Sequence, residues 1–230
     1  MRGGNNLDIN NCWYKEVCKI EPCDESCIRY RCMTALFKRS RLPEARWKQF
    51  PLIAYDEDLE TYKRLATIKD SIESFVRHGK NIYIFSAIPG NGKTSWAIRL
   101  MSAYFDQIWD YGAFECRGIY LNVTSFLQQA KDNISNPTQE YQELLKDLVE
   151  CDLVIWDDIG IDKTTDYEYK LLFNLIDQRV LACKSNIYTT NVSDKNCSSV
   201  LGARLASRML GNCEIFEFVD EDKRGLICDG

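Results

Sequence analysis

Residues 80–107 decide the fold of this chain. They comprise an apolar run, KNIYIFS (80–86), a loop, AIPGNGKT (87–94), and an amphipathic stretch, SWAIRLMSAYFDQ (95–107). The first segment has the composition of a buried strand and the last has the periodicity of a helix. A strand joined to a helix by a short glycine-containing loop is the repeating unit of a parallel α/β sheet.

The loop has the composition of a phosphate-binding loop. Gly90 and Gly92 let backbone N–H groups curl round a β-phosphate, and the helix N-terminus favours the anion. Lys93 is expected to reach the β- and γ-oxygens of ATP, and Thr94 to offer its hydroxyl to Mg²⁺. The P-loop pattern begins with Gly, and here Ala87 stands at that place; alanine is small, so we expect tolerance. The predicted nucleotide contacts come from Ala87, Pro89, Gly90, Asn91, Gly92, Lys93, Thr94 and Ser95.

A second element, DLVIWDD (152–158), predicts a buried strand that ends in two acids. With a phosphate loop in the same chain, this pattern indicates a Walker B element. Asp157 is expected to hold Mg²⁺, directly or through water. Asp158 is expected to polarise the attacking water, and its short reach predicts slow hydrolysis.

Two later segments carry further candidate catalytic residues. SNIYTTN (185–191) predicts a strand whose last residue, Asn191, orients the water or senses the γ-phosphate; the alternative is an Asn turn. VLGARLASRMLG (200–211) predicts one helix with Arg204 and Arg208 on one face. Either guanidinium could serve a neighbour's γ-phosphate, and the alternative is a solvated basic face.

Helix signals mark the segments between these strands. A strand is predicted at 118–123, and two helices at 124–150, the second with Asn136 as its N-cap, Pro137 at N1 and Gln139 at N3. A further helix starts at Asp166 with a capping box. A last strand is predicted at 214–219.

The N-terminus is rich in cysteine. Five of the eleven cysteines lie in the first 32 residues, spaced C-x5-C-x4-C-x3-C-x4-C. In a reducing compartment such a cluster favours zinc over disulfides, and the only His is distant, so the site would be all-Cys. The alternative is free thiols in a helical hairpin. The predicted zinc ligands, with Cys32 as the spare thiol, are Cys12, Cys18, Cys23 and Cys27.

The overall composition excludes several classes of protein. The chain has 230 residues, with 29 Lys and Arg against 34 Asp and Glu, so it does not coat nucleic acid by bulk charge. No apolar run suits a membrane helix and no secretory signal is apparent, so we expect a cytoplasmic protein without membrane contact. Residues 33–60 mix basic and aromatic side chains, which suits either single-stranded nucleic acid or, as we favour, a strap packed on the next domain.

The motifs IPGNGKTSWA, DLVIWDDIG, IYTTN and LGARLASRM occur in the order and spacing of the DnaC/DnaI/IstB branch of AAA+ ATPases. The chain resembles this branch, and most of all phage-type DnaC-like helicase loaders, over about residues 50–220. Its start is similar to the zinc-binding domain of DnaI-type loaders. The resemblance implies a parallel sheet of order 5-1-4-3-2 flanked by helices, without a C-terminal lid. It also implies a zinc-binding helicase-docking module at 1–40, a basic linker at 41–59 and an ATPase domain at 60–230.

The resemblance also implies a function. Members bind ATP, Mg²⁺ and Zn²⁺, form homo-oligomers with ATP, and load the DnaB-type replicative helicase onto single-stranded DNA. The paired helices within 124–150 would contact that DNA. Hydrolysis of ATP to ADP and phosphate is expected to be slow and oligomer-dependent. Two alternatives remain: an IstB-type transposition helper ATPase, and an ATP-binding switch with little hydrolysis.

Overall fold

The computed structural model describes residues 12–15, 18, 27–48, 52, 56–160 and 164–222. Cys23, one of the predicted zinc ligands, lies outside them. The helices are α1 (Ile28–Arg39), α2 (Leu59–Asp70), α3 (Ile72–Arg77), α4 (Lys93–Gly112), α5 (Val123–Asp132), α6 (Gln139–Glu150), α7 (Asp166–Leu181), α8 (Asp194–Leu201) and α9 (Ala203–Leu210), with short 3₁₀ turns at Glu44–Arg46 and Asp56–Asp58. The strands are β1 (Asn81–Phe85), β2 (Gly118–Asn122), β3 (Leu153–Asp157), β4 (Ser185–Thr190) and β5 (Cys213–Glu217).

The strands form one parallel sheet in the order β2-β3-β4-β1-β5. This is the predicted order 5-1-4-3-2, read from the other edge. The strand β1 lies between β4 and β5, and β3 lies between β2 and β4. The loops that follow β1, β3 and β4 therefore open at the same edge of the sheet, where ligands of parallel α/β folds bind.

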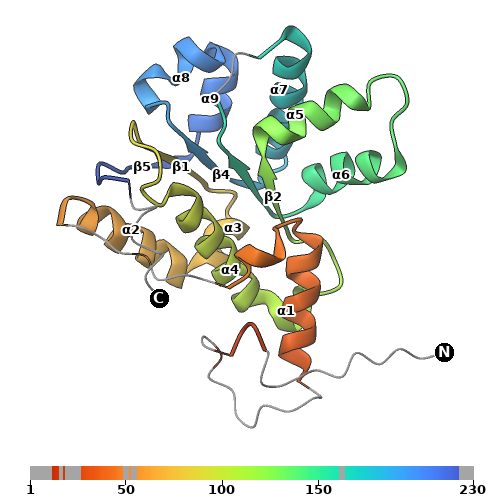
Figure 1. The fold of residues 1–230 in the computed structure, drawn as a ribbon, viewed down its shortest axis with the longest axis vertical. Helices are drawn as coiled ribbons and strands as arrows, with labels where there is room; N and C mark the ends of the chain where they lie inside the picture. Colours follow the sequence, from red (N-terminus) through yellow and green to blue (C-terminus); the bar gives the residue numbers. More distant parts are fainter. Residues whose placement is uncertain are drawn as a thin grey trace.

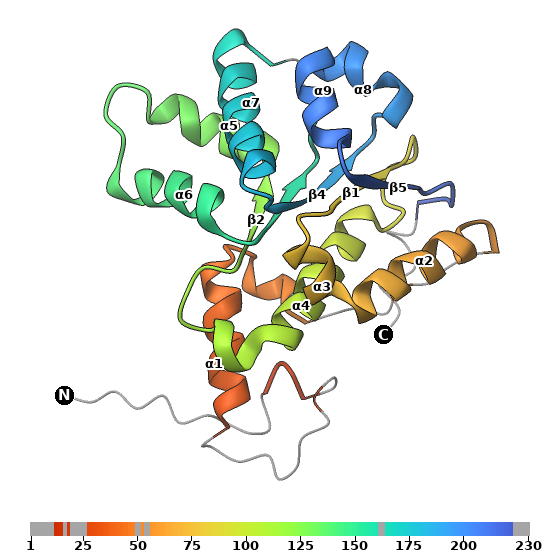
Figure 2. The same ribbon diagram turned by 180° about the vertical axis from the view of Figure 1, so that it is seen from behind.

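Helices cover both faces of the sheet. Helices α1 to α4 pack on one face and α5 to α9 on the other, as Figures 1 and 2 show from opposite sides. Because side chains of a strand alternate between faces, Ile82 and Ile84 of β1 belong to the first core, whereas Tyr83 and Phe85 belong to the second. Burial on both faces explains why β1 and β3 are almost continuously apolar.

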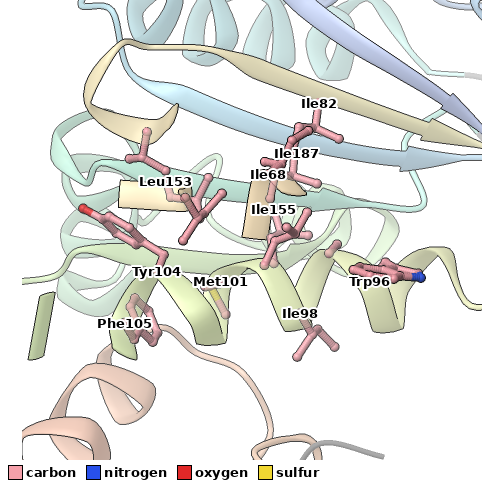
Figure 3. Close-up of a cluster of buried hydrophobic side chains, with 14 of the residues drawn as sticks. Ile68, Ile82, Trp96, Ile98, Met101, Tyr104, Phe105, Leu153, Ile155 and Ile187 are labelled. Atoms are coloured by element: carbon pink, nitrogen blue, oxygen red, sulfur yellow. The ribbon is translucent and has the colours of Figure 1, made fainter. Parts of the chain in front are cut away.

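The long helix α4 fills the centre of the first core. Met101 and Phe105 of α4 are fully buried and lie beneath Leu153 and Ile155 of the sheet (Figure 3). The helix begins directly at the phosphate loop. The packing of α4 against the sheet therefore fixes the position of the phosphate loop at the end of β1.

Residues 27–48 belong to the same core. Phe37 is fully buried and packs edge-on against Phe105, while Trp47 packs against Phe37. The backbone carbonyl of Ser40 accepts a hydrogen bond from the N–H of Tyr120, at 2.8 Å. Phe37 thus packs directly on α4, and a backbone hydrogen bond ties this stretch to β2.

Two predicted helix boundaries are wrong. The N-cap of α6 is Thr138, whose hydroxyl accepts from the N–H of Tyr141 at 3.2 Å, and not Asn136. The predicted single helix over 200–211 is two helices, because Gly202, with φ 82°, ends α8 and starts α9. None of the helices that the structure describes is long and apolar enough to cross a membrane.

Candidate nucleotide and magnesium site

The phosphate loop connects β1 to α4, as predicted. Gly90 and Gly92 have φ values of 77° and 102°, in the left-handed region where a side chain would be strained. Gly92 is also the N-cap residue of α4, so the first N–H groups of the helix point into the loop. The carboxylate of Asp222 lies against Gly90 and occupies the space that a Cβ would need.

Hydrogen bonds from buried polar groups hold the loop in shape. The Ser86 hydroxyl accepts from the side-chain amide of Asn91 at 2.5 Å and from the N–H of Ile88 at 3.0 Å. Lys93 is only 6% exposed, and its ammonium donates to the carbonyl of Ile88 at 3.2 Å. The lysine is therefore directed into the loop, where it can reach bound phosphate oxygens. Ala87 and Pro89 are exposed, and Ser95 is partly buried at the start of α4.

The Asp157 carboxylate lies at the end of β3 and is 3% exposed. One oxygen accepts hydrogen bonds from the hydroxyls of Thr94 at 2.7 Å and Thr189 at 2.5 Å. The other oxygen accepts from the Tyr120 hydroxyl at 2.7 Å. Burial, and then the Asp157 charge, raise the pKa of Tyr120 well above its ordinary value, so the phenol stays a donor.

These oxygens suit magnesium. Mg²⁺ prefers six oxygen ligands at about 2.0–2.1 Å, so neighbouring ligand oxygens lie about 3 Å apart. The Thr94 hydroxyl and the Asp157 carboxylate already stand 2.7 Å apart, directly after the phosphate loop. Thr94 and Asp157 would therefore hold the ion that accompanies a nucleotide.

Asp158 adopts a left-handed backbone conformation, with φ 60°. Its N–H donates to the Thr189 hydroxyl at 3.1 Å, which fixes the turn after β3. The residue lines a cavity of about 620 Å³ between α5 and α7, together with Thr124, Lys131 and Thr165. Asp158 thus directly follows Asp157 and borders open space.

Three residues of the site were missed in the sequence. Ser86, Tyr120 and Thr189 hold the loop and Asp157 in place. In the strand register Asp157 pairs with Asn122 of β2. The pairing of β3 with β4 ends at Trp156 and Tyr188, so Asp157 lies beside Thr189, the next residue of β4. Polar residues near the carboxyl ends of apolar strands were the available signal, because parallel strands bring those ends together.

The structure locates the remaining candidate catalytic residues on the surface. Asn191 directly follows β4 and is exposed. Arg204 and Arg208 both lie on α9, as expected, and line a surface hollow of about 480 Å³ with Ser207. The Arg208 guanidinium forms an ion pair with Asp177 of α7, at 2.5 Å.

The described cysteines of the N-terminus do not gather into a metal site. Among the residues that the structure describes, no group of three ligating side chains could hold a metal ion. Cys12, Cys18 and Cys32 pack against the first core, and the Cys27 sulfur caps α1 by accepting from the N–H of Tyr30 at 3.4 Å. The described thiols by themselves therefore do not fit zinc.

Known proteins share this sequence pattern and fold. The replicative helicase loader DnaC of Escherichia coli strain K12 is 28% identical over 134 residues, which are 56% of this chain and 51% of DnaC. The chain thus spans about half the length of the curated relatives it matches. Its fold is that of the crystal structure of the DnaC helicase loader, with a TM-score of 0.62 and 20% identity over 76% of this chain and 99% of that one. The crystal structure of DnaI matches with a TM-score of 0.61 and 15% identity over 80% and 95%.

The family described as IstB-like ATP binding protein matches residues 24–224. That range includes the phosphate loop, the Walker B strand and helix α9. With this match over most of its length, its strand order and its phosphate loop, the chain belongs to the IstB-like ATP-binding protein family.

Proposed function

We propose that this protein is an ATP-dependent loader of the replicative helicase. The observation that carries the proposal is the contact between Thr94 and Asp157 beside a formed phosphate loop, in a fold shared with DnaC and DnaI. This arrangement supports ATP binding with Mg²⁺. The helicase as partner rests on relatives that are named replicative helicase loaders.

The roles of the residues follow from their positions. Gly90, Gly92 and the first turn of α4 bind phosphate oxygens, and Lys93 neutralises them. Thr94 and Asp157 would hold Mg²⁺, which would supply charge stabilisation to the phosphates of a bound nucleotide. Asp158 orients the attacking water and accepts its proton, and Asn191 serves the same water from β4.

Hydrolysis is expected to be slow and to depend on assembly. Asp158 carries one methylene fewer than Glu, so its carboxylate reaches less far toward the water. In one protomer Arg208 is bound by Asp177, so its use on a neighbour's nucleotide requires that this ion pair opens. We propose that ATP-dependent homo-oligomerisation on single-stranded DNA provides that change.

A loading assay tests the proposal. Lys93→Ala is compared with Lys170→Ala, which removes an exposed lysine on α7. We expect Lys93→Ala to lose ATP binding and helicase loading onto single-stranded DNA, and Lys170→Ala to keep both. A chain that binds ATP and hydrolyses it, yet never recruits a replicative helicase, would contradict the loader assignment.

A transposition helper is the second candidate, because the matching family is described by its IstB-like members. The two functions differ in the protein that the chain binds in the presence of ATP: a replicative helicase or a transposase. Pull-down with a replicative helicase and with an IS21-type transposase, each with and without ATP, separates them. The cysteine-rich start favours the loader.

The zinc-binding docking module at 1–40 remains a prediction from cysteine number and spacing. Elemental analysis of the full chain is expected to give one zinc per chain. Cys18→Ser should lose that metal, whereas Cys183→Ser, at an exposed site on the turn after α7, should retain it. Metal-free protein that is fully folded would remove zinc from the proposal.

A further inference from the structure

A pair of cysteines lies at the amino ends of β2 and β3, at the sheet edge opposite the phosphate loop. Gly118 of β2 pairs with Leu153 of β3. The carbonyl of Arg117 accepts from the N–H groups of both Asp152 and Leu153, at 3.1 Å each. The segments that lead into β2 and β3 therefore run side by side.

Cys116 and Cys151 each lie two positions before the Gly118–Leu153 pair. Neighbouring strands are about 4.8 Å apart, so this register brings the two side chains together. The two thiols are near enough that each shifts the pKa of the other. The Cys116 thiol donates to the carbonyls of Arg39 at 3.7 Å and Gly118 at 3.9 Å, and the Cys151 thiol donates to the carbonyl of Leu153 at 3.5 Å.

The two thiols differ in their access to solvent. Cys151 is 2% exposed and is the C-cap residue of α6, whereas Cys116 is partly exposed. A small reagent can therefore approach the pair from the side of Cys116. The two side chains form one site with an outer and an inner sulfur.

A buried guanidinium faces the inner sulfur. Arg179 of α7 is fully buried, and its side chain donates to the amide oxygen of Asn186 at 2.7 Å and to the Ser185 carbonyl at 2.6 Å. It also donates to the carbonyls of Leu148 and Cys151, at 2.6 and 2.9 Å. All of these acceptors are neutral.

The Cys151 sulfur lies 3.5 Å from the same guanidinium. The nearby Asp152 contributes only its carbonyl, because its carboxylate is bound by Lys184 at 2.9 Å and by Arg117 at 3.1 Å. A buried positive charge is strongly favoured by an anion in contact with it. Among the groups that the structure places on Arg179, the Cys151 thiol is the one that can become that anion.

The pKa values of the two thiols shift in opposite directions. Burial disfavours the thiolate of Cys151, but the hydrogen bond from Cys116 and the charge of Arg179 outweigh it and lower the pKa of Cys151. The hydrogen bond to Cys151, and then burial, raise the pKa of Cys116. Cys151 is thus the more acidic thiol of the pair, and Cys116 is the thiol that holds its proton more firmly.

We propose that Cys116 and Cys151 form a dithiol site that hydrogen peroxide oxidises to an intrachain disulfide. The Cys151 thiolate attacks one peroxide oxygen, the O–O bond breaks, and the leaving oxygen takes the Cys116 proton and departs as water. The Cys116 thiolate then attacks the sulfenic sulfur of Cys151 and displaces hydroxide. Two electrons pass from the two sulfurs to the peroxide, and one S–S bond forms.

Peptide mapping of the full-length protein tests this site. The reduced chain is exposed to rising doses of hydrogen peroxide, quenched, alkylated in denaturant and digested. We expect a Cys116–Cys151 linked peptide, two hydrogens lighter than the separate peptides, which disappears on reduction with dithiothreitol. Since an ordinary thiol is only a few per cent ionised at neutral pH, we expect the pair to react at least about tenfold faster than the exposed Cys183.

Variants separate a specific site from general oxidation. Cys183→Ser should leave the linked peptide unchanged, and Cys151→Ser should slow oxidation of Cys116 to the rate of Cys183. Recovery of both Cys116 and Cys151 as alkylated thiols, at a dose that oxidises Cys183, would overturn the proposal. This mapping uses the unchanged chain, so it decides the matter even where Cys151→Ser fails to fold.

Discussion

At Asp158 the backbone restricts the side chain. A φ of 60° is tolerated by Asn and Asp much better than by longer side chains, because their short polar groups can bond locally. Glu at this position would cost about 1–2 kcal/mol in backbone strain. The shorter acid therefore matches the local turn, which the hydrogen bond from the Asp158 N–H to Thr189 also fixes.

Asp158→Asn should separate ATP binding from hydrolysis. Asn tolerates the left-handed turn, so the fold and the phosphate loop should be kept, while the group that accepts the proton is lost. We expect unchanged ATP affinity by titration and a fall in turnover of at least about 100-fold. Turnover at the parental rate would show that Asp158 has no part in the chemistry.

Thr189 carries two contacts through one hydroxyl. It donates to Asp157 and accepts from the N–H of Asp158, and it is fully buried. Thr189→Val keeps the shape and leaves both partners with one hydrogen bond fewer, so the free energy of unfolding should fall by about 1–3 kcal/mol. Urea titration measures this change. The matched control is Thr67→Val, at an exposed position of α2, which is expected to stay within about 0.5 kcal/mol of the parent.

At the scale of elements, helix α7 depends on its capping box. The Thr165 hydroxyl accepts from the N–H of Glu168, and the Glu168 carboxylate accepts from the N–H of Thr165 at 2.6 Å. Thr165→Ala should lower the free energy of unfolding by about 1 kcal/mol. Equilibrium urea unfolding checks this value, and an unchanged midpoint would mean that α7 is held by packing alone.

Local signals predicted most of the architecture. The capping box of α7 is confirmed, because both of its partners lie within four residues of each other. The apolar runs that became β1 and β3 are confirmed too, since strands buried on both faces need continuous apolar sequence. The order of the strands came from the resemblance, and the structure confirms it.

The errors have physical causes. Thr138 follows Asn136 by two residues, and the Asn133 side chain, which accepts from the N–H of Thr138 at 2.8 Å, favours the later helix start. Gly202 sits in an otherwise helical pattern, and its φ of 82°, which glycine adopts without strain, ends the helix there. The partners of Asp157 come from three separate segments, which spacing in one sequence does not bring together.

At the scale of the whole molecule, we expect α9 to lie at the interface between subunits. Arg208 should act on a neighbour's nucleotide, with Arg204 as the alternative. Mixing Arg208→Ala chains with Lys93→Ala chains should restore part of the ATPase activity at mixed interfaces. No recovery, with assembly intact by light scattering, would place the arginine within its own subunit or outside the reaction.

The Asp177 ion pair gives this experiment a second arm. Asp177→Asn removes the charge that binds Arg208 within one protomer. If Arg208 is needed in trans, the variant should reach full activity at lower protein concentration than the parent chain. Activity that requires a higher concentration would instead mean that Asp177 positions the arginine for its neighbour.

The central position of β1 also has a consequence for biosynthesis. Asn81 at the start of β1 binds Asn186 of β4, 105 residues later, and Gly211 beyond it, 130 residues later. At about 5–20 residues per second, the ribosome needs on the order of 5–25 s to deliver those partners. During that time the apolar run 81–85 emerges with both strand edges unpaired, so the nascent chain is most exposed to aggregation or chaperone capture before β4 and β5 are translated.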